Sequence, residues 1–433
     1  MKFVHRVGLL FLVGLLTAHA QTGGKLSLTQ AIDIALQNSP NILRARKELE
    51  AADARILQAG RIPNPEIEIS WNETPTNFNI AAADERDIGV RQQIEFPGKR
   101  GGRIDVATHD KDIAELSLER SKILVTAQVK SAYYKLLLSQ ETVRSLQEQV
   151  KLFKDLQELL TSRYQAGQAD YLDVVRAKVE IARLNNDLAE ALREHRLRKS
   201  QLNIIIGRNA DEPFEADDTL SSVPLSLERE TVVGQLLAKS AALQIARRFV
   251  VRQQSAFSLA KTSYLPDFSL GLFHQRRAEE PPFDANRFSG TTTNALGIQL
   301  GVSVPLWFWQ EPKGQVQEAA ALVDVASINH ASTERRVRAN VLSAFDLVKV
   351  VETQLTVFDE TLLIDSQDIL STAIAQYQNN QIDILNLFDV YRTYRATRIE
   401  YLRALHNYAV ASAELEAAGE LPNDNGFSIG DQQ

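Results

Sequence analysis

The sequence predicts a mainly α-helical protein with a small β part, and three observations lead to this fold class. One motif occurs twice, at 163–173 and again at 376–386, with Tyr, Gln, Asp and Leu in register. Long helical patterns precede both copies, and four short segments elsewhere alternate polar and apolar residues. Because internal repeats determine how every other pattern is interpreted, we treat the chain as a tandem duplication in which each motif is the tip of a helical hairpin.

The N-terminus has the order of a cleaved secretory signal peptide over residues 1–20. Lys2 and Arg6 precede an apolar stretch at 7–16, and an A-x-A sequence ends the segment. The alternative is a membrane anchor, for which this apolar stretch is too short. We expect cleavage after Ala20. Because Gln21 rather than a cysteine follows, we expect no lipid anchor on the mature N-terminus.

The mature chain, 21–433, reads as one unit made of two repeats. They span about 28–207 and 228–419, and an acidic crossing segment with two prolines, 208–227, joins them. We expect the tail after 419 to be disordered.

Composition excludes several classes of function. The formal net charge is −7 and the chain has no basic block, so nucleic acid is not an expected partner. No cysteine occurs, which excludes disulfides, thiolate metal sites and cysteine nucleophiles. The histidines are scattered without ligand spacing, so we expect no metal site. No catalytic constellation is evident, and we expect neither an enzyme nor a cofactor.

Helical periodicity opens both repeats and later continues for unusual lengths. The opening segments, 28–60 and 228–264, are interrupted near Ser39 and Ser240, where we expect two helices to meet. Later, 98–164 and 311–377 each show the pattern of one unbroken helix, and helices of globular proteins rarely exceed about 25 residues. A heptad-like seam supports coiled-coil packing, at Val129, Ala132, Leu136, Ser139, Val143, Leu146, Val150 and Phe153.

Four alternating segments predict β-strands in two hairpins. They lie at 66–72, 88–96, 268–272 and 296–306, and each has one apolar face. Soluble hairpins that cap the helices are the alternative. Strand length and four aromatic residues near strand ends favour transmembrane strands with a membrane girdle, at Trp71, Trp307, Phe308 and Trp309. Since a barrel needs at least about eight strands, four must be shared between subunits.

The layout and the repeated tip motif resemble the TolC-like outer-membrane efflux family over about 28–419. The run at 92–103, Gln-Gln-Ile-Glu-Phe-Pro-Gly-Lys-Arg-Gly-Gly-Arg, is similar to the heavy-metal branch of that family, which serves cobalt, zinc and cadmium export. Pro97 departs from the glycine usual there. The resemblance implies a homotrimer in the outer membrane of a Gram-negative bacterium, with one 12-stranded barrel and a long α-helical barrel in the periplasm.

The resemblance also implies a function. The chain would be the passive outer-membrane channel of a tripartite efflux system, with a periplasmic adaptor (a membrane fusion protein) and an inner-membrane RND pump as partners. Metal cations or small toxic compounds are the implied substrates. Two alternatives stay open: an exit duct for type I protein secretion, and a coiled-coil structural protein that spans no membrane.

Site residues follow by motif position within the resemblance. The periplasmic gate falls on Asp173 and Tyr377, which would form a latch, and on Asn386 and Asp389, of which Asp389 would form an acidic ring. The hairpin tips would contact the adaptor. Their residues are Ala166, Gly167, Gln168, Asn379, Asn380 and Gln381.

Overall fold

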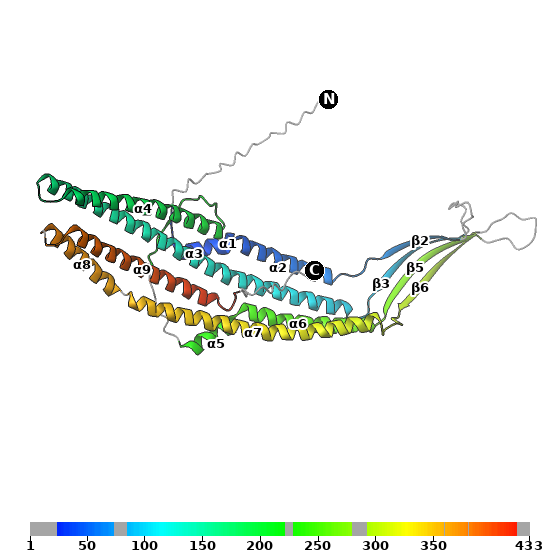
Figure 1. Ribbon diagram of the computed structural model, residues 1–433. Helices are drawn as coiled ribbons and strands as arrows, with labels where there is room; N and C mark the ends of the chain where they lie inside the picture. Colours follow the sequence, from blue (N-terminus) through cyan, green and yellow to red (C-terminus); the bar gives the residue numbers. More distant parts are fainter. Residues whose placement is uncertain are drawn as a thin grey trace, which may run out of the picture.

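The chain is described by a computed structural model, which covers residues 24–72, 85–220, 228–278, 292–358, 360–379 and 381–421. The predicted signal peptide and residues 221–227 of the crossing segment lie outside the described residues. The protein is elongated, with helices along most of its length and one sheet at the end opposite the two hairpin tips (Figure 1).

The described residues of the first repeat form four helices: α1 (Leu28–Asn38), α2 (Pro40–Ala59), α3 (Lys99–Gln165) and α4 (Tyr171–Ile205). Ser27 starts α1 through a capping box, in which its hydroxyl accepts from the Gln30 amide at 3.3 Å. Pro40 occupies the first turn of α2, where its missing N–H costs nothing. The predicted break near Ser39 is therefore confirmed.

The second repeat follows the same plan with α5 (Arg229–Lys239), α6 (Ala241–Lys261), a 3-10 turn η2 (Thr262–Tyr264), α7 (Glu311–Val357), α8 (Glu360–Gln378) and α9 (Ile384–Ala417). The predicted break near Ser240 is confirmed, and the Ser240 hydroxyl accepts from the Leu243 amide at 3.2 Å.

The prediction of one unbroken helix over 311–377 is wrong. Helix α7 ends at Val357, and Phe358 leaves helical geometry with φ −102° and ψ 60°. Three β-branched residues, Thr353, Thr356 and Val357, lie in the last turns of α7, where restricted side-chain rotation lowers helix propensity. By contrast, α3 continues for 67 residues without a break.

Four antiparallel strands form one sheet in the order β2-β3-β5-β6. Their bounds are β2 (Glu66–Asn72), β3 (Glu85–Ile94), β5 (Asp267–Ala278) and β6 (Thr292–Ser303). The alternating pattern predicted a last strand that extends to Leu306, but β6 ends at Ser303, two residues before Pro305, which has no N–H for a ladder.

A second, two-stranded sheet escaped prediction. Its strands β1 (Lys25–Leu26) and β4 (Glu215–Ala216) pair in parallel and tie the crossing segment to the start of the first repeat. The buried Tyr133 of α3 stabilises this junction, because its hydroxyl donates toward the Leu26 carbonyl at 2.7 Å and the Asp218 carboxylate at 2.8 Å.

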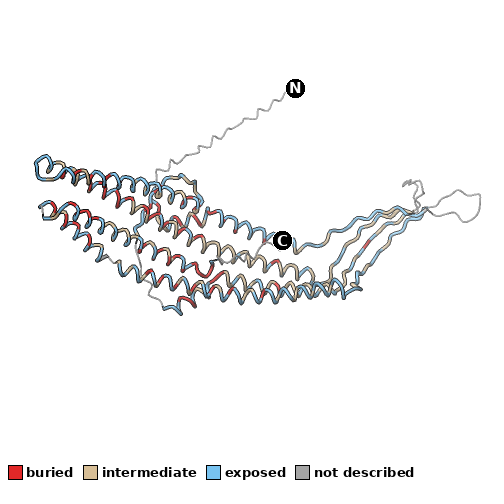
Figure 2. The backbone as a smooth tube through the Cα atoms, viewed as in Figure 1, coloured by how far each residue is buried: buried red, intermediate tan, exposed pale blue. Residues whose placement is uncertain are grey.

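Buried residues concentrate in the helices, while almost all residues of the four-stranded sheet are exposed or half-buried (Figure 2). The predicted seam of α3 is buried apart from Ala132, which is half-buried, so its heptad reading is confirmed. The residues of the seam nearer the hairpin tip, Leu146, Val150 and Phe153, belong to a core with α4, α8 and α9. Val129 and Leu136, farther from the tip, pack with α1 and α4.

In both repeats the residue that follows the last helix contacts the break between the first two helices, but the contacts differ. In the first, Gly207 follows α4 at φ +79° and lies against the Asn38 carbonyl at the α1–α2 break. In the second, Glu420 follows α9 and its buried carboxylate accepts from the amides of Ala241 and Ala242 at 2.7 and 2.9 Å, capping α6. The prediction of a disordered tail directly after 419 is thus wrong at Glu420.

The closure at Gly207 yields a stability prediction. A Cβ there would lie 2.4 Å from the Asn38 carbonyl oxygen, and the left-handed backbone adds about 1–2 kcal/mol for any other residue. We expect Gly207→Ala to destabilise the protein by about 2 kcal/mol or more, measured by thermal loss of helical circular dichroism in detergent. Gly234→Ala is the matched control: it lies in α5 with open space around it, and should be neutral or mildly stabilising. Equal melting temperatures for the two variants would contradict this account.

Candidate channel sheet, strand–helix joint and gate

The register of the four-stranded sheet places all its alternating apolar residues on one face. Ile67 pairs with Val90, Val90 with Leu272, and Leu272 with Ile298. Directly paired residues point to the same side of a sheet. The apolar face is exposed, with Ile67 at 74% and Ile298 at 71%. An exposed apolar face of four strands requires an apolar environment or a partner to cover it.

The opposite face is polar and contains small residues. Glu68 accepts a salt bridge from Arg91 at 2.8 Å, and the Ser70 hydroxyl donates to Asp87 at 3.3 Å. Phe273 is the aromatic exception, and its ring occupies space that Gly297 leaves open: a Cβ at Gly297 would approach the Phe273 ring to 2.2 Å. This face can therefore border water along its length.

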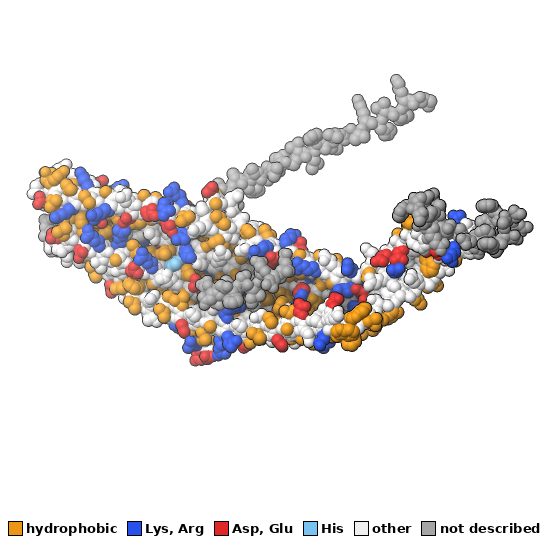
Figure 3. Space-filling view, turned by 45° about the vertical axis from the view of Figure 1, so that its right-hand side comes forward, with side chains coloured by type: hydrophobic (Ala, Val, Ile, Leu, Met, Phe, Trp, Pro, Cys, Tyr) orange, Lys and Arg blue, Asp and Glu red, His pale blue; other side chains and the backbone are white. Residues whose placement is uncertain are grey.

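The predicted girdle residues lie at two levels. Trp71 sits near the far end of β2, paired with Arg86 of β3. Trp307, Phe308 and Trp309 occupy the turn between β6 and α7 and are 54–62% exposed. Figure 3 shows hydrophobic side chains gathered where the sheet joins the helices. The aromatic residues thus bracket the apolar face at both ends, as a membrane girdle would.

A network of charged side chains fixes the joint between strands and helices. Gly98 turns the chain at φ +104°, and α3 begins at Lys99. The Lys99 ammonium donates to Asp267 of β5 at 2.8 Å, and the same Asp267 oxygen accepts from the Phe96 amide at 2.9 Å. One side chain of β5 therefore anchors both the end of the first hairpin and the start of α3.

A second pair braces the same turn. Arg103 donates to both oxygens of Glu95 at 2.7 and 2.8 Å, and its Nε reaches the Ala59 carbonyl of α2 at 3.3 Å. The hydrogen bonds from Arg103 hold the pKa of Glu95 below its usual range. Sequence reasoning located this turn but missed both pairs. A Glu and an Arg eight residues apart across a Pro-Gly turn were the available signal.

The first hairpin tip, Ala166, Gly167 and Gln168, closes α3 with a Schellman motif. The Gln168 amide donates to the Arg163 carbonyl at 2.8 Å and the Gly167 amide to the Tyr164 carbonyl at 3.0 Å. Gly167 has φ +71°, and no atom lies within 4 Å of a Cβ built there. All three tip residues are exposed.

The second tip repeats this geometry. The Gln381 amide donates to the Gln376 carbonyl at 2.9 Å, the equivalent of the bond between Gln168 and Arg163. Asn379 and Gln381 are exposed, whereas Asn380 lies outside the described residues. The two predicted tips are thus alike in backbone and lie at the same end of the molecule (Figure 1).

Arg163 links the two hairpins, a role that sequence reasoning missed. Its guanidinium donates to the Tyr377 carbonyl at 3.2 Å and to the Gln378 carbonyl, the last carbonyls of α8. The same guanidinium lies 5.5 Å from the centre of the Tyr377 ring. A cation suits a helix C-terminus, where the last carbonyls lack helical partners.

The predicted gate residues lie in two neighbouring places: Asp173 and Tyr377 lie where the two hairpins meet, and Asn386 and Asp389 lie at the start of α9. The Asp173 carboxylate accepts from Arg176 on its own helix at 3.2 Å. Tyr377 is buried, and burial, followed by the nearby charge of Asp173, raises the pKa of its phenol. Asp173 and Tyr377 are thus neighbours, and the direct latch between them stays a prediction.

Asn386 and Asp389 lie on the first turns of α9 and are both exposed. The Asn386 amide donates to Asp383, which caps α9, at 2.8 Å. In the first repeat the position equivalent to Asp389 holds Arg176, the partner of Asp173. The repeats therefore differ in charge at the same height.

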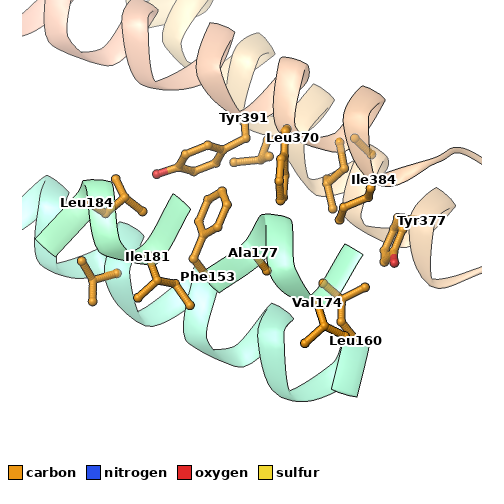
Figure 4. Packing of buried hydrophobic residues seen from close by; sticks show 14 of the residues in the cluster. Phe153, Leu160, Val174, Ala177, Ile181, Leu184, Leu370, Tyr377, Ile384 and Tyr391 are labelled. Atoms are coloured by element: carbon orange, nitrogen blue, oxygen red, sulfur yellow. The ribbon is translucent and has the colours of Figure 1, made fainter. Parts of the chain in front are cut away.

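An apolar core holds the two hairpins together just behind these residues. Phe153 of α3 packs against Tyr391 of α9, with ring centroids 4.6 Å apart and nearly perpendicular, and against Phe388 at 5.3 Å (Figure 4). The core includes Leu160 of α3 and Val174 of α4. Polar gate residues thus sit at the end of a packed apolar base.

Within the described residues, no helix combines the length and apolarity needed to span a bilayer. The described part of the chain also holds no group of three or more His, Cys, Asp or Glu placed to bind a metal ion.

Comparison with known proteins agrees with this architecture. Residues 31–208 and 232–419 match the sequence profile of the outer membrane efflux protein family. The chain is 24% identical over 385 residues to the cobalt-zinc-cadmium resistance protein CzcC of Cupriavidus metallidurans, covering 89% of this chain and 88% of that one.

Solved structures show the same fold. The open state of the MtrE outer membrane channel of Neisseria gonorrhoeae has a TM-score of 0.71 at 17% identity, covering 91% of this chain and 88% of that chain. The outer membrane protein VceC of Vibrio cholerae has a TM-score of 0.69 at 20% identity, covering 90% and 96%. The chain belongs to the outer membrane efflux protein family, and it is the outer-membrane channel of a tripartite efflux system, with its helices extending into the periplasm.

Proposed function

We propose that three copies of this chain close one twelve-stranded barrel and one helical tube, which together form a passive exit duct. The observation that carries this proposal is the sheet order β2-β3-β5-β6, in which β2 and β6 each have an edge that no described strand pairs. Unpaired edges are not tolerated in hydrocarbon, and four strands cannot close a barrel alone. Pairing of β6 with β2 of a neighbour satisfies both edges.

The duct receives its substrate from a periplasmic adaptor and an inner-membrane pump of the RND type. Energy comes from that pump. The adaptor docks on the exposed tips, whose small and amide side chains allow close backbone approach.

Metal cations are the substrate class that we propose. Two observations support this choice: the similarity to CzcC across most of both chains, and the charge of the polar sheet face. On that face the described strands carry two guanidiniums, those of Arg91 and Arg277, against five carboxylates, those of Glu66, Glu68, Glu85, Asp87 and Asp267. A lumen with excess negative charge favours cations over anions.

The tips form the gate of the duct. Asp389 contributes one carboxylate per chain to a ring near the threefold axis, while Asp173 is offset by Arg176. Carboxylates brought together around an axis repel each other and attract cations. Arg163 and the proposed latch of Asp173 with Tyr377 hold the two hairpins together while the gate is closed.

The proposal predicts a trimeric pore. Protein extracted from outer membranes in mild detergent should have the mass of three chains by light scattering, and should conduct ions in planar bilayers. Heating should convert the trimer to monomer. A stable monomer in native extracts, or a trimer without conductance, would overturn the duct.

The acidic ring predicts a change in ion selectivity. Asp389→Asn should move the cation-to-anion permeability ratio toward one and weaken block by divalent cations, because the ring charge is removed. Reversal potentials in asymmetric KCl measure this. Asp368→Asn, an exposed carboxylate farther back on α8, is the matched control and should leave the ratio unchanged. An unchanged ratio in Asp389→Asn would rule out the ring.

The tips predict a docking defect that is separate from folding. Gly167→Trp should abolish efflux, measured as lost metal tolerance, because an indole would project from an otherwise open tip. Gly167→Asn should retain efflux, because asparagine tolerates the left-handed backbone and occupies the equivalent position of the second repeat. Trimer yield should match wild type in both variants. Full tolerance in Gly167→Trp would argue against docking at this tip.

A further inference from the structure

We propose that a cleft between α3, α4 and α9 binds a small organic acid that has an apolar body and a hydrogen-bond donor. This site goes beyond the proposed passage of substrate through the duct, because it lies among the helices of a single chain. One chain supplies every residue of the site, so the site does not depend on the assembly of three chains.

The cleft lies near the middle of α3, where that helix packs between α4 and α9 (Figure 1). Val129 of α3 faces the core that contains α1. Leu138 lines the cleft and follows Val129 by nine residues, which is two and a half helical turns, so it points to the opposite side. The core around α1 therefore does not cover the cleft.

The size and the walls of the cleft suit an apolar ligand body. Its volume is about 350 Å³, within the range of about 300–1,000 Å³ that is usual for small-molecule sites. Half-buried apolar side chains from all three helices line it, namely Leu138, Ala191, Ile399 and Leu402. Burying an aromatic or aliphatic body between these side chains would remove apolar surface from water on both sides.

The charged residues of the lining leave one cation without a counter-charge. The carboxylate of Glu194 pairs with Arg198 at 2.6 Å. Arg403 pairs at 2.7 Å with Glu400, which does not line the cleft. Within the described part of the chain, Lys135 has neither a hydrogen bond nor an ion pair. An ammonium group beside apolar walls attracts a carboxylate and repels metal cations, so the expected ligand is an acid.

His406 contributes a second polar group that lacks a partner. Its Nδ1 lies 3.2 Å from the side-chain oxygen of Asn407. Because an amide oxygen only accepts, Nδ1 carries the proton and Nε2 is left as an acceptor. Nε2 is buried, and no described group donates to it. Burial lowers the pKa of His406, and the charges of Lys135 and Arg198 lower it further, so the ring is neutral at neutral pH.

The two unpartnered groups define the ligand more closely than the apolar walls do. A buried acceptor without a donor is unfavourable, and a hydroxyl or N–H group of the ligand would supply the donor that Nε2 lacks. The carboxylate of the same ligand would accept from Lys135. We therefore commit to an apolar acid that carries a hydroxyl or N–H group.

Direct binding tests the site. The probe is a hydroxynaphthoate with its hydroxyl and carboxylate on opposite rings, titrated into the protein in phosphatidylcholine nanodiscs and followed by fluorescence. It should bind saturably, with one site per chain. Lys135→Gln should weaken binding by about tenfold, because a charge-assisted hydrogen bond is lost. His406→Phe should weaken it by about fivefold, because a neutral hydrogen bond is lost.

Lys154→Gln is the matched control, because Lys154 is an exposed lysine of α3 that does not line the cleft, and its affinity should equal that of wild type. Naphthol, which lacks the carboxylate, should bind wild type and Lys135→Gln equally. Absence of saturable binding to wild type, or equal affinity of the hydroxynaphthoate for wild type and Lys135→Gln, would overturn the site. Equal affinity for wild type and His406→Phe would overturn the role of His406. Failure of the duct would appear separately, as a missing trimer or missing conductance, and would leave binding within one chain unchanged.

Discussion

The constraint on which the rest of the structure depends is the backbone of an open sheet. Within the part of the chain that the structure describes, strands β2 and β6 each leave a row of amide and carbonyl groups unpaired, and the same sheet exposes an apolar face. In water the apolar face is unfavourable, and in lipid the open edges are unfavourable. Both conditions are met together when identical sheets join edge to edge, with the apolar face outward and the polar face around an aqueous lumen. In the assembly that we propose, the sheet of one copy is therefore a part of a barrel that a single copy cannot complete.

A closed barrel and a helical tube must also meet at a defined angle. The ion pairs at the turn between β3 and α3 fix that angle. Lys99 and Arg103 lie one turn apart on α3, and each reaches a carboxylate on a different strand segment, Asp267 or Glu95. The Arg103 side chain also contacts the end of α2. These ion pairs are mostly shielded from solvent, so they are screened less by salt than surface pairs. The glycines around them leave the backbone free to turn, as Gly98 does at φ +104°.

Sequence reasoning recovered most of the elements because their periodicities are long and local. The strands and the seam of α3 follow from the spacing of apolar residues. The helix break near Ser39 follows from Pro40, and the break near Ser240 follows from the likeness of the second repeat to the first. The break after Val357 was missed because the apolar pattern continues through it. The weak helix propensity of Thr353, Thr356 and Val357 does not interrupt that pattern. Contacts made across the fold were missed as well. Arg163 and Glu420 bind backbone groups, which leave no complementary residue type in the sequence. The gate roles of Asp389 and Asp173 came from resemblance, and one chain cannot display a ring.

The duplication explains why the two hairpins are alike in backbone and unlike in surface. Equivalent tip bonds close both, yet Tyr377 is buried against Arg163 whereas its counterpart Tyr164 is 46% exposed. Similarly, Ile384 is buried and its counterpart Tyr171 is 56% exposed, with the Tyr164 and Tyr171 rings 5.4 Å apart. The first hairpin thus exposes Tyr164 and Tyr171 at the positions where the second hairpin buries Tyr377 and Ile384. The two hairpins therefore have different surroundings. In the tube that we propose, the first hairpin faces the second hairpin of the next chain, where the exposed Tyr164 and Tyr171 would supply the contact between chains, while Arg163 supplies the contact within one chain.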